Sequence, residues 1–140
     1  MKESLSALII EHSLNLQKED ILVVDYQSHT RYILESIIRN TQDKGINARL
    51  FFRQELIRLS DLETLDNLLN GATSYIRLGG GIYKRPSKHE TKEIQRKEED
   101  IIIKRSSIKW VSTQYPSKYM SRRLGIDLKK LRELYFKCCL

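Results

Sequence analysis

The sequence predicts an α/β fold in which a largely parallel sheet of four or five strands carries helices on both faces, a Rossmann-like layering. Two observations lead to this prediction. Short apolar, β-branched segments alternate along the chain with segments whose apolar residues recur at helical spacing. The series fills all 140 residues without an internal repeat or a flexible linker, a length typical of one domain, so residues 1–140 are expected to form a single domain.

The first half of the chain supplies two of the expected strands. An amphipathic helix over residues 3–16 leads into the apolar run 21–24, whose composition is typical of a buried parallel strand. A second helix is expected from Thr30 to Gly45, because glycine is well suited to the left-handed exit of a helix. Residues 47–52 form the second expected strand.

The second half continues the alternation. Ser60 and Glu63 make a capping-box pattern that should begin a helix ending near residue 70, and Asp127 should cap the last helix of the chain. The segments between them are expected in the order strand 75–78, helix 88–105, strand 108–113 and helix 117–124.

The composition excludes several classes of protein. The apolar runs are only a few residues long, whereas a membrane span needs about 20, so no membrane association is expected. Glu11, His12 and Asn15 interrupt the first apolar stretch, which argues against a secretory signal and favours a cytoplasmic location. Cys138 and Cys139 are adjacent and poorly placed for an ordinary disulfide.

No complete catalytic, cofactor or metal site can be assembled from local spacing. His12, His29 and His89 fall on different elements without ligand-spaced partners; His12 is expected at the core edge and His89 in solvent, whereas His29 follows the first strand, where a functional role is geometrically possible. The Gly79–Gly81 run could admit a phosphate or could form a tight structural turn. Asp25 could bind a ribose or metal, or could act as a turn or cap residue.

Basic residues gather in the loops that follow the strands. Twenty-five Lys and Arg against 18 Asp and Glu give a formal net charge of +7. Arg53, Lys84, Arg85 and Lys118 are the candidates for a phosphate-binding edge, since the carboxyl ends of parallel strands meet on one side of a sheet. The alternative function is therefore a stand-alone module that binds a nucleotide or nucleic acid, and the competing interpretation is scattered, solvated charge.

Six segments in order carry a resemblance to a known family. They are LSALIIEHSLNLQ (5–17), DILVV (20–24), GINA (45–48), ATSYIRL (72–78), WVSTQYP (110–116) and residues 127–139. In these segments the chain resembles the N-terminal domain of the thermophilic metalloprotease family of aminopeptidases, the aminopeptidase T or leucyl aminopeptidase type. The Gly79–Gly81 run and the basic loop after it depart from the family pattern.

The resemblance implies a cytoplasmic, dimeric, two-metal exopeptidase that removes N-terminal amino acids from peptides. Its zinc, cobalt or manganese ligands would belong to a later catalytic domain that these residues do not include, so no catalytic residue is carried over. The chain is accordingly expected to be a non-catalytic structural and assembly domain. Its expected partners are the catalytic domain or a second copy in a homodimer, with peptide substrate bound only through the parent enzyme and nucleic acid less favoured.

The last helix carries more apolar residues than one buried stripe can hold. Side chains at positions 134–136 spread over about 200° of a helix that turns 100° per residue, so Leu134 and Phe136 cannot both point into one core. Leu134, Phe136 and Leu140 are the candidates for an interdomain contact. The competing interpretation is that the final turn frays or folds back onto its own sheet.

Overall fold

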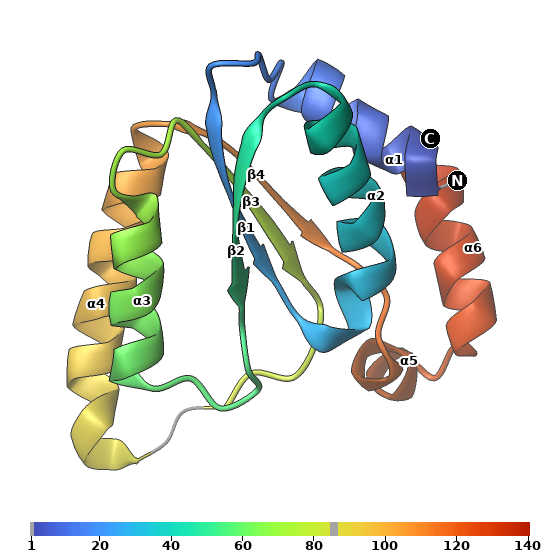
Figure 1. The fold of residues 1–140 in the computed structure, drawn as a ribbon. Coiled ribbons are helices and arrows are strands. Elements are labelled where there is room, and N and C mark those ends of the chain that lie inside the picture. The colour runs from blue at the N-terminus through green and yellow to red at the C-terminus, as the bar shows by residue number, and fades with distance from the viewer. Residues whose placement is uncertain (1, 85–86) are drawn as a thin grey trace.

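The sheet contains four strands, all parallel, in the order β2-β1-β3-β4 (Figure 1). A computed structural model of the chain describes residues 2–84 and 87–140. The strands are β1 (Ile21–Tyr26), β2 (Asn47–Phe52), β3 (Ser74–Gly79) and β4 (Lys109–Gln114). The predicted α/β class, with a parallel sheet and helices on both faces, is confirmed.

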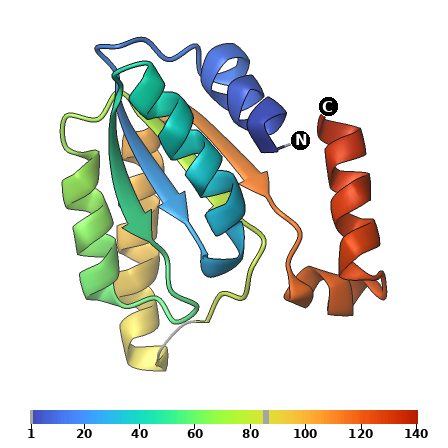
Figure 2. The same cartoon turned by 45° about the vertical axis from the view of Figure 1, so that its right-hand side comes forward.

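Helices cover the two faces of the sheet in separate layers (Figures 1 and 2). The helical elements are α1 (Lys2–Ala7), the π-helical η1 (Leu8–Ser13), the 3₁₀ turn η2 (Ser28–Thr30), α2 (Arg31–Asp43), α3 (Leu59–Leu69), α4 (Lys88–Ser106), α5 (Lys118–Leu124) and α6 (Leu128–Cys139). α3 and α4 lie on one face, and α1 and α2 on the other, with α6 standing beyond β4 on the α1 side. Within the described residues, no helix combines the length and apolar character that a membrane crossing requires.

The alternation of side chains along β1 divides the core into two clusters. Leu22 and Val24 point to the face covered by α2, where they join Ile37, and Val23 points to the opposite face, where it joins Leu65 of α3. All three β1 residues are fully buried because β1 lies in the middle of the sheet with a layer of helices on each side. Apolar burial of this kind is the main favourable term in folding.

Of the two predicted helix caps, the one at Asp127 is confirmed and the one at Ser60 is not. Asp127 caps α6 as predicted, since its carboxylate accepts the backbone N–H groups of Lys129 and Lys130. The predicted capping box of Ser60 and Glu63 is wrong. The N-cap is Arg58 and α3 begins at Leu59, two residues earlier than a cap at Ser60 would place it. The carboxylate of Asp61 accepts the backbone N–H of Arg58, so Ser60 lies inside the first turn and not at the cap.

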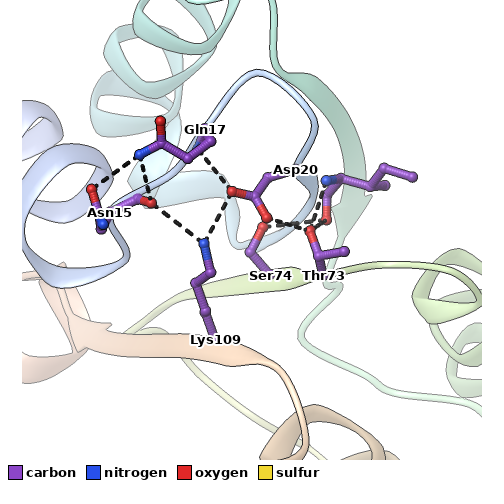
Figure 3. Close-up of polar contacts among 7 residues, drawn as sticks. Asn15, Gln17, Asp20, Thr73, Ser74 and Lys109 are labelled. Carbon is purple, nitrogen blue, oxygen red and sulfur yellow. Dashed lines mark hydrogen bonds and ion pairs between the residues drawn. The ribbon is translucent and has the colours of Figure 1, made fainter.

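A closed polar network joins the strands at their amino ends (Figure 3). The carboxylate of Asp20 accepts the Gln17 N–H at 2.7 Å, the Thr73 hydroxyl at 2.7 Å and the Lys109 ammonium at 3.0 Å. Burial alone would raise the pKa of Asp20, but these hydrogen bonds and the Lys109 charge together lower it. Hydrogen bonds occupy both oxygens of the Asp20 carboxylate, so we assign this network a structural role, linking the starts of β1, β3 and β4.

Candidate functional site

An open cleft of about 490 Å³ lies at the carboxyl ends of the strands, the lower edge of the sheet in Figure 1. β1 connects to β2 on one side of the sheet and β3 connects to β4 on the other, so the strand order reverses between β1 and β3. Ligands of open α/β sheets usually bind at such a reversal. The lining residues are Gln27, Ser28, His29, Phe52, Arg53, Gln54, Glu55, Gly81, Ile82, Ser117, Lys118, Tyr119, Leu128 and Arg132.

The floor of the cleft is held by the side chain of Gln27. Its carbonyl oxygen accepts the Gly81 N–H at 3.0 Å, and its amide nitrogen donates to the Ile82 carbonyl at 3.1 Å. The backbone N–H of Gln27 in turn donates to the hydroxyl of Thr30, which is fully buried. These bonds tie the loop after β1 to the loop after β3, so the two walls of the reversal are fixed relative to each other.

Close backbone approach explains the glycines of the Gly79–Gly81 run. Gly80 has a φ of +107°, and a Cβ at that position would lie 2.3 Å from the carbonyl oxygen of Tyr115. A Cβ on Gly81 would come within 3.1 Å of the side chains of Gln27 and His29. The geometry accounts for the run as a tight structural turn, one of the two interpretations that the sequence left open.

His29 has a defined tautomer in the cleft. Its Nε2 lies 3.1 Å from the Gly79 carbonyl oxygen and 3.0 Å from that of Tyr115. Because carbonyls only accept hydrogen bonds, we assign the ring proton to Nε2, which leaves the lone pair on Nδ1. Burial lowers the pKa of His29, and the positive charge of Arg132 lowers it further. The imidazole is therefore a neutral hydrogen-bond acceptor at neutral pH.

The other two histidines lie away from the cleft. His89 is exposed at the start of α4, as predicted. His12 was expected at the core edge, and that prediction is wrong: it is exposed on η1, because the π-helical turn directs Ile9 and Ile10 into the core instead. In the part of the chain that the structure describes, no three His, Cys, Asp or Glu side chains are grouped so that they could hold a metal ion.

The structure separates the residues of the predicted basic edge. Lys118 is exposed and lines the cleft. Lys84 is exposed but lies on the isolated bridge to Leu56, outside the cleft lining. Arg53 lines the cleft but is only 6% exposed, because its guanidinium is turned toward Asp25. Arg85 lies outside the described residues.

Asp25 and Arg53 form a buried ion pair beneath the cleft. Arg53 Nε and Nη2 donate to the Asp25 carboxylate at 2.9 and 2.6 Å, and the Tyr75 hydroxyl donates to it at 2.5 Å. Burial opposes the charge of Arg53, but the hydrogen bonds and charge of Asp25 outweigh it and raise the Arg53 pKa. Burial and the Asp25 charge likewise raise the pKa of Tyr75. Because these partners occupy the Asp25 carboxylate, it is not free to bind a ribose or a metal ion.

Arg132 of α6 is the lining residue that sequence reasoning missed. It lies 107 positions after Asp25, on a helix that follows the last strand, and no local pattern links it to the strand-end loops. The chain reversal through α5 brings it to the cleft that Lys118 also lines. Neither cation has an ion-pair partner within residues 2–84 and 87–140.

The predicted interdomain residues divide between the core and the surface. Phe136 is 6% exposed and packs with its ring centroid 6.2 Å from Tyr115, whereas Leu134 is 42% and Leu140 56% exposed. Leu134 and Phe136 therefore do point in different directions, as the helical geometry requires. Phe136 belongs to the chain's own core, which leaves Leu134 and Leu140 as the exposed members of the set.

Comparison with known proteins gives a likeness of fold. Neither a protein-family model nor a curated protein sequence matches the chain. Among solved structures, the chain is similar to wild-type AmpT, an aminopeptidase T, from Thermus thermophilus, with a TM-score of 0.53 and 13% sequence identity over 80% of this chain. The chain spans 35% of the length of that protein. At this identity the likeness shows a shared fold.

Proposed function

We propose that the chain is a non-catalytic structural and assembly domain of a metal-dependent aminopeptidase, whose parent removes N-terminal amino acids from peptides. The observation that carries the proposal is the fold shared with AmpT, which extends over 80% of this chain. The ordered sequence segments that resemble the same family support it independently, because they span most of the same four strands and flanking helices.

The engagement of the acidic side chains supports a non-catalytic role. Asp25 is paired with Arg53, Asp20 with Lys109 and Asp66 with Lys97 and Lys104. A catalytic zinc, cobalt or manganese site needs several convergent ligands with an open position. The described residues do not fit such a metal, so in this proposal the metals and the hydrolytic step belong to residues outside these 140.

The flank of α6 supports a role in assembly. Leu134 of α6 and Leu140, the residue directly after α6, are exposed and apolar, while Phe136 anchors the helix to the core. Exposed apolar surface of this kind commonly marks a contact with another domain or subunit. We assign this flank to contact with the catalytic domain or with a second copy in a homodimer.

Two measurements on the purified chain test the proposal. An aminoacyl reporter substrate should not be hydrolysed when zinc, cobalt or manganese is supplied. Metal-dependent turnover that is lost in His12→Ala, His29→Ala or Asp25→Ala would contradict the non-catalytic role.

The second measurement addresses assembly. Sedimentation velocity should show a dimer that the substitutions L134D and L140D together shift toward monomer, with K130M and K137M, at exposed positions of α6, as a control of equal charge change. A chain that stays monomeric at high concentration, alone and in the presence of a catalytic domain of this enzyme class, would contradict the assembly role.

A further inference from the structure

The cleft at the reversal between β1 and β3 has no part in the proposed function. Its volume of about 490 Å³ falls in the range of small-molecule sites, roughly 300 to 1,000 Å³. Hydrogen bonds of Gln27 and the close packing of Gly80 and Gly81 fix its floor before any ligand arrives. A preformed site of this size at this place in an α/β sheet is suited to a small molecule.

The charges of the cleft select an anion. Lys118 and Arg132 stand on the wall built by α5 and α6, and neither is neutralised by an ion pair among the described residues. Arg53 on the opposite wall is neutralised by Asp25, and Glu55 supplies the negative charge of the lining. The excess of positive charge is therefore on the α5–α6 wall, and an arginine and a lysine are the side chains suited to a phosphate group.

Aromatic rings and one acceptor define the rest of the ligand. Phe52 and Tyr119 line the cleft and are 40% and 38% exposed. Arg31 lies over the Phe52 ring at 5.6 Å and Arg123 over the Tyr119 ring at 5.7 Å, so each ring has at most its other face for stacking. Nδ1 of His29 carries a lone pair because Nε2–H is held by the carbonyls of Gly79 and Tyr115. The aromatic rings suit a flat ring of the ligand, and the Nδ1 lone pair of His29 suits a hydroxyl group.

We propose that this cleft binds a nucleoside monophosphate. Lys118 and Arg132 hold the phosphate, an aromatic ring of the cleft, Tyr119 or Phe52, stacks on the base, and His29 Nδ1 accepts a hydrogen bond from a ribose hydroxyl. The site is independent of the proposed assembly role, since Leu134 and Leu140 do not line it.

A second hollow, of about 160 Å³ between β3 and α4, is a weaker candidate for an anion. Arg77 and Arg105 line it together with the carboxylate of Glu98. The carboxylate shares the hollow with these arginines, and its negative charge disfavours an added anion.

Calorimetric titration of the whole chain with AMP at low salt tests the proposal. Three matched probes each lack part of AMP. Adenosine lacks the phosphate, ribose 5-phosphate lacks the base, and inorganic phosphate lacks both the base and the ribose. AMP should bind at least about tenfold more tightly than each probe, because only AMP meets both the cations and the rings. The double substitution K118M/R132M should weaken AMP binding at least about tenfold, the loss of one charge-assisted hydrogen bond or more.

The control variant K130M/K137M removes the same two charges from exposed positions of α6 outside the cleft and should bind AMP as the parent chain does. Unchanged circular dichroism and unfolding midpoints would show that both variants fold. Three outcomes would overturn the proposal: no binding of AMP at millimolar concentration, equal weakening in the two variants, or inorganic phosphate binding as tightly as AMP. Because none of these readouts involves hydrolysis or self-association, failure here leaves the test of the assembly role intact.

Discussion

Arg53 carries its charge at a position that is 6% exposed, and Asp25 is the residue that makes this possible. Removing a guanidinium from water is costly unless a carboxylate and further hydrogen bonds replace the water. Three hydrogen bonds from Arg53 and one from the Tyr75 hydroxyl satisfy the Asp25 carboxylate. Asp25 lies on β1, Tyr75 on β3 and Arg53 directly after β2, so these contacts fasten the end of β2 to β1 and β3 directly beneath the cleft.

Asp25→Ala is predicted to destabilise the chain by about 3–5 kcal/mol, because it leaves the buried Arg53 charge without a partner. The double substitution Asp25→Leu with Arg53→Met should cost less than the single one, since it removes both charges. Urea unfolding followed through Trp110, the one tryptophan of the chain, measures both effects. Asp66→Ala is the control: its lysine partners are more exposed, at 25% and 45%, and we expect a loss of about 1 kcal/mol or less. A loss for Asp25→Ala as small as that of Asp66→Ala would refute this account.

Arg53 also shows where residue-level reasoning from the sequence reaches its limit. Its place after the second strand predicted a cleft cation, and the structure does put it in the cleft lining. Its engagement by Asp25 depends on register: Asp25 pairs with Phe51, which sets Arg53 two positions along on the same face. Register is a property of the assembled sheet, and the apolar runs of the two strands do not specify it.

At the scale of the element, α6 is attached to the domain through a small aromatic cluster. Phe136 and Tyr135 pack edge-on against Tyr115 with ring centroids 6.2 and 5.4 Å away, and the Tyr135 hydroxyl shares a hydrogen bond of 2.6 Å with Thr113 of β4. Tyr135 and Phe136 thus provide much of the attachment of α6 to the domain.

Phe136→Ala is predicted to destabilise the chain by about 3 kcal/mol, the usual cost of truncating a buried phenylalanine. Leu134→Ala, on the same helix at 42% exposure, should change the free energy of unfolding by less than about 0.5 kcal/mol. Chemical unfolding gives both values, and hydrogen exchange of the α6 amides shows whether the helix detaches separately in Phe136→Ala. A loss of unfolding free energy in Leu134→Ala as large as that in Phe136→Ala would contradict this account, because an exposed side chain cannot contribute as much as a buried one.

The elements themselves were largely predictable, and their ends were not. The period of apolar residues located all four strands, and Asp127 marked the start of α6 correctly. The π-helical η1 was not predicted because its five-residue hydrogen-bond spacing has no distinct apolar signature over one turn. The start of α3 was misplaced because its N-cap, Arg58, is not a residue type that favours this position, and the cap is completed by Asp61 from the third position of the helix.

For the whole molecule, the shifted pKa values predict two stages of acid destabilisation. The pKa of His29 in the folded chain lies below the ordinary value of 6.5, so between these values the unfolded chain binds more protons. Stability is therefore full above about pH 6.5 and declines as the pH falls below it. Hydrogen bonds from Lys104 and Lys97 lower the pKa of Asp66, and hydrogen bonds from Gln17, Thr73 and Lys109 lower the pKa of Asp20. The stability that these two carboxylates contribute is therefore present above about pH 3.8 and is lost as the pH falls below it.

Urea midpoints measured from pH 7.5 to pH 3 test this prediction. His29→Gln should remove the first decline and keep the second, while His89→Gln, at an exposed site on α4, should leave the profile unchanged. A first decline that persists in His29→Gln would assign it to another group.

The strand order is the part of the architecture that the sequence did not supply. The pattern of Ile21–Val24 and of the three later strands predicted a parallel sheet, but neighbours in the sheet are set by which faces pack once the helices form. Without the order β2-β1-β3-β4, the reversal between β1 and β3 could not be placed, and neither could the cleft. Arg132 is missed for the same reason, since only the assembled fold brings α6 to that wall.

The central place of β1 has a consequence for the nascent chain. Ile21 donates its backbone N–H to the side chain of Thr73, 52 positions later. At a synthesis rate of roughly 5–20 residues per second, β1 waits about 3–10 seconds between leaving the ribosome and meeting β3. During that interval one edge of the Leu22–Val24 run is open to any other unpaired strand. A chaperone bound to this segment, or fast translation of residues 27–73, reduces the exposure of this edge. Strongly slowed translation of the same residues is expected to increase aggregation of the newly made protein.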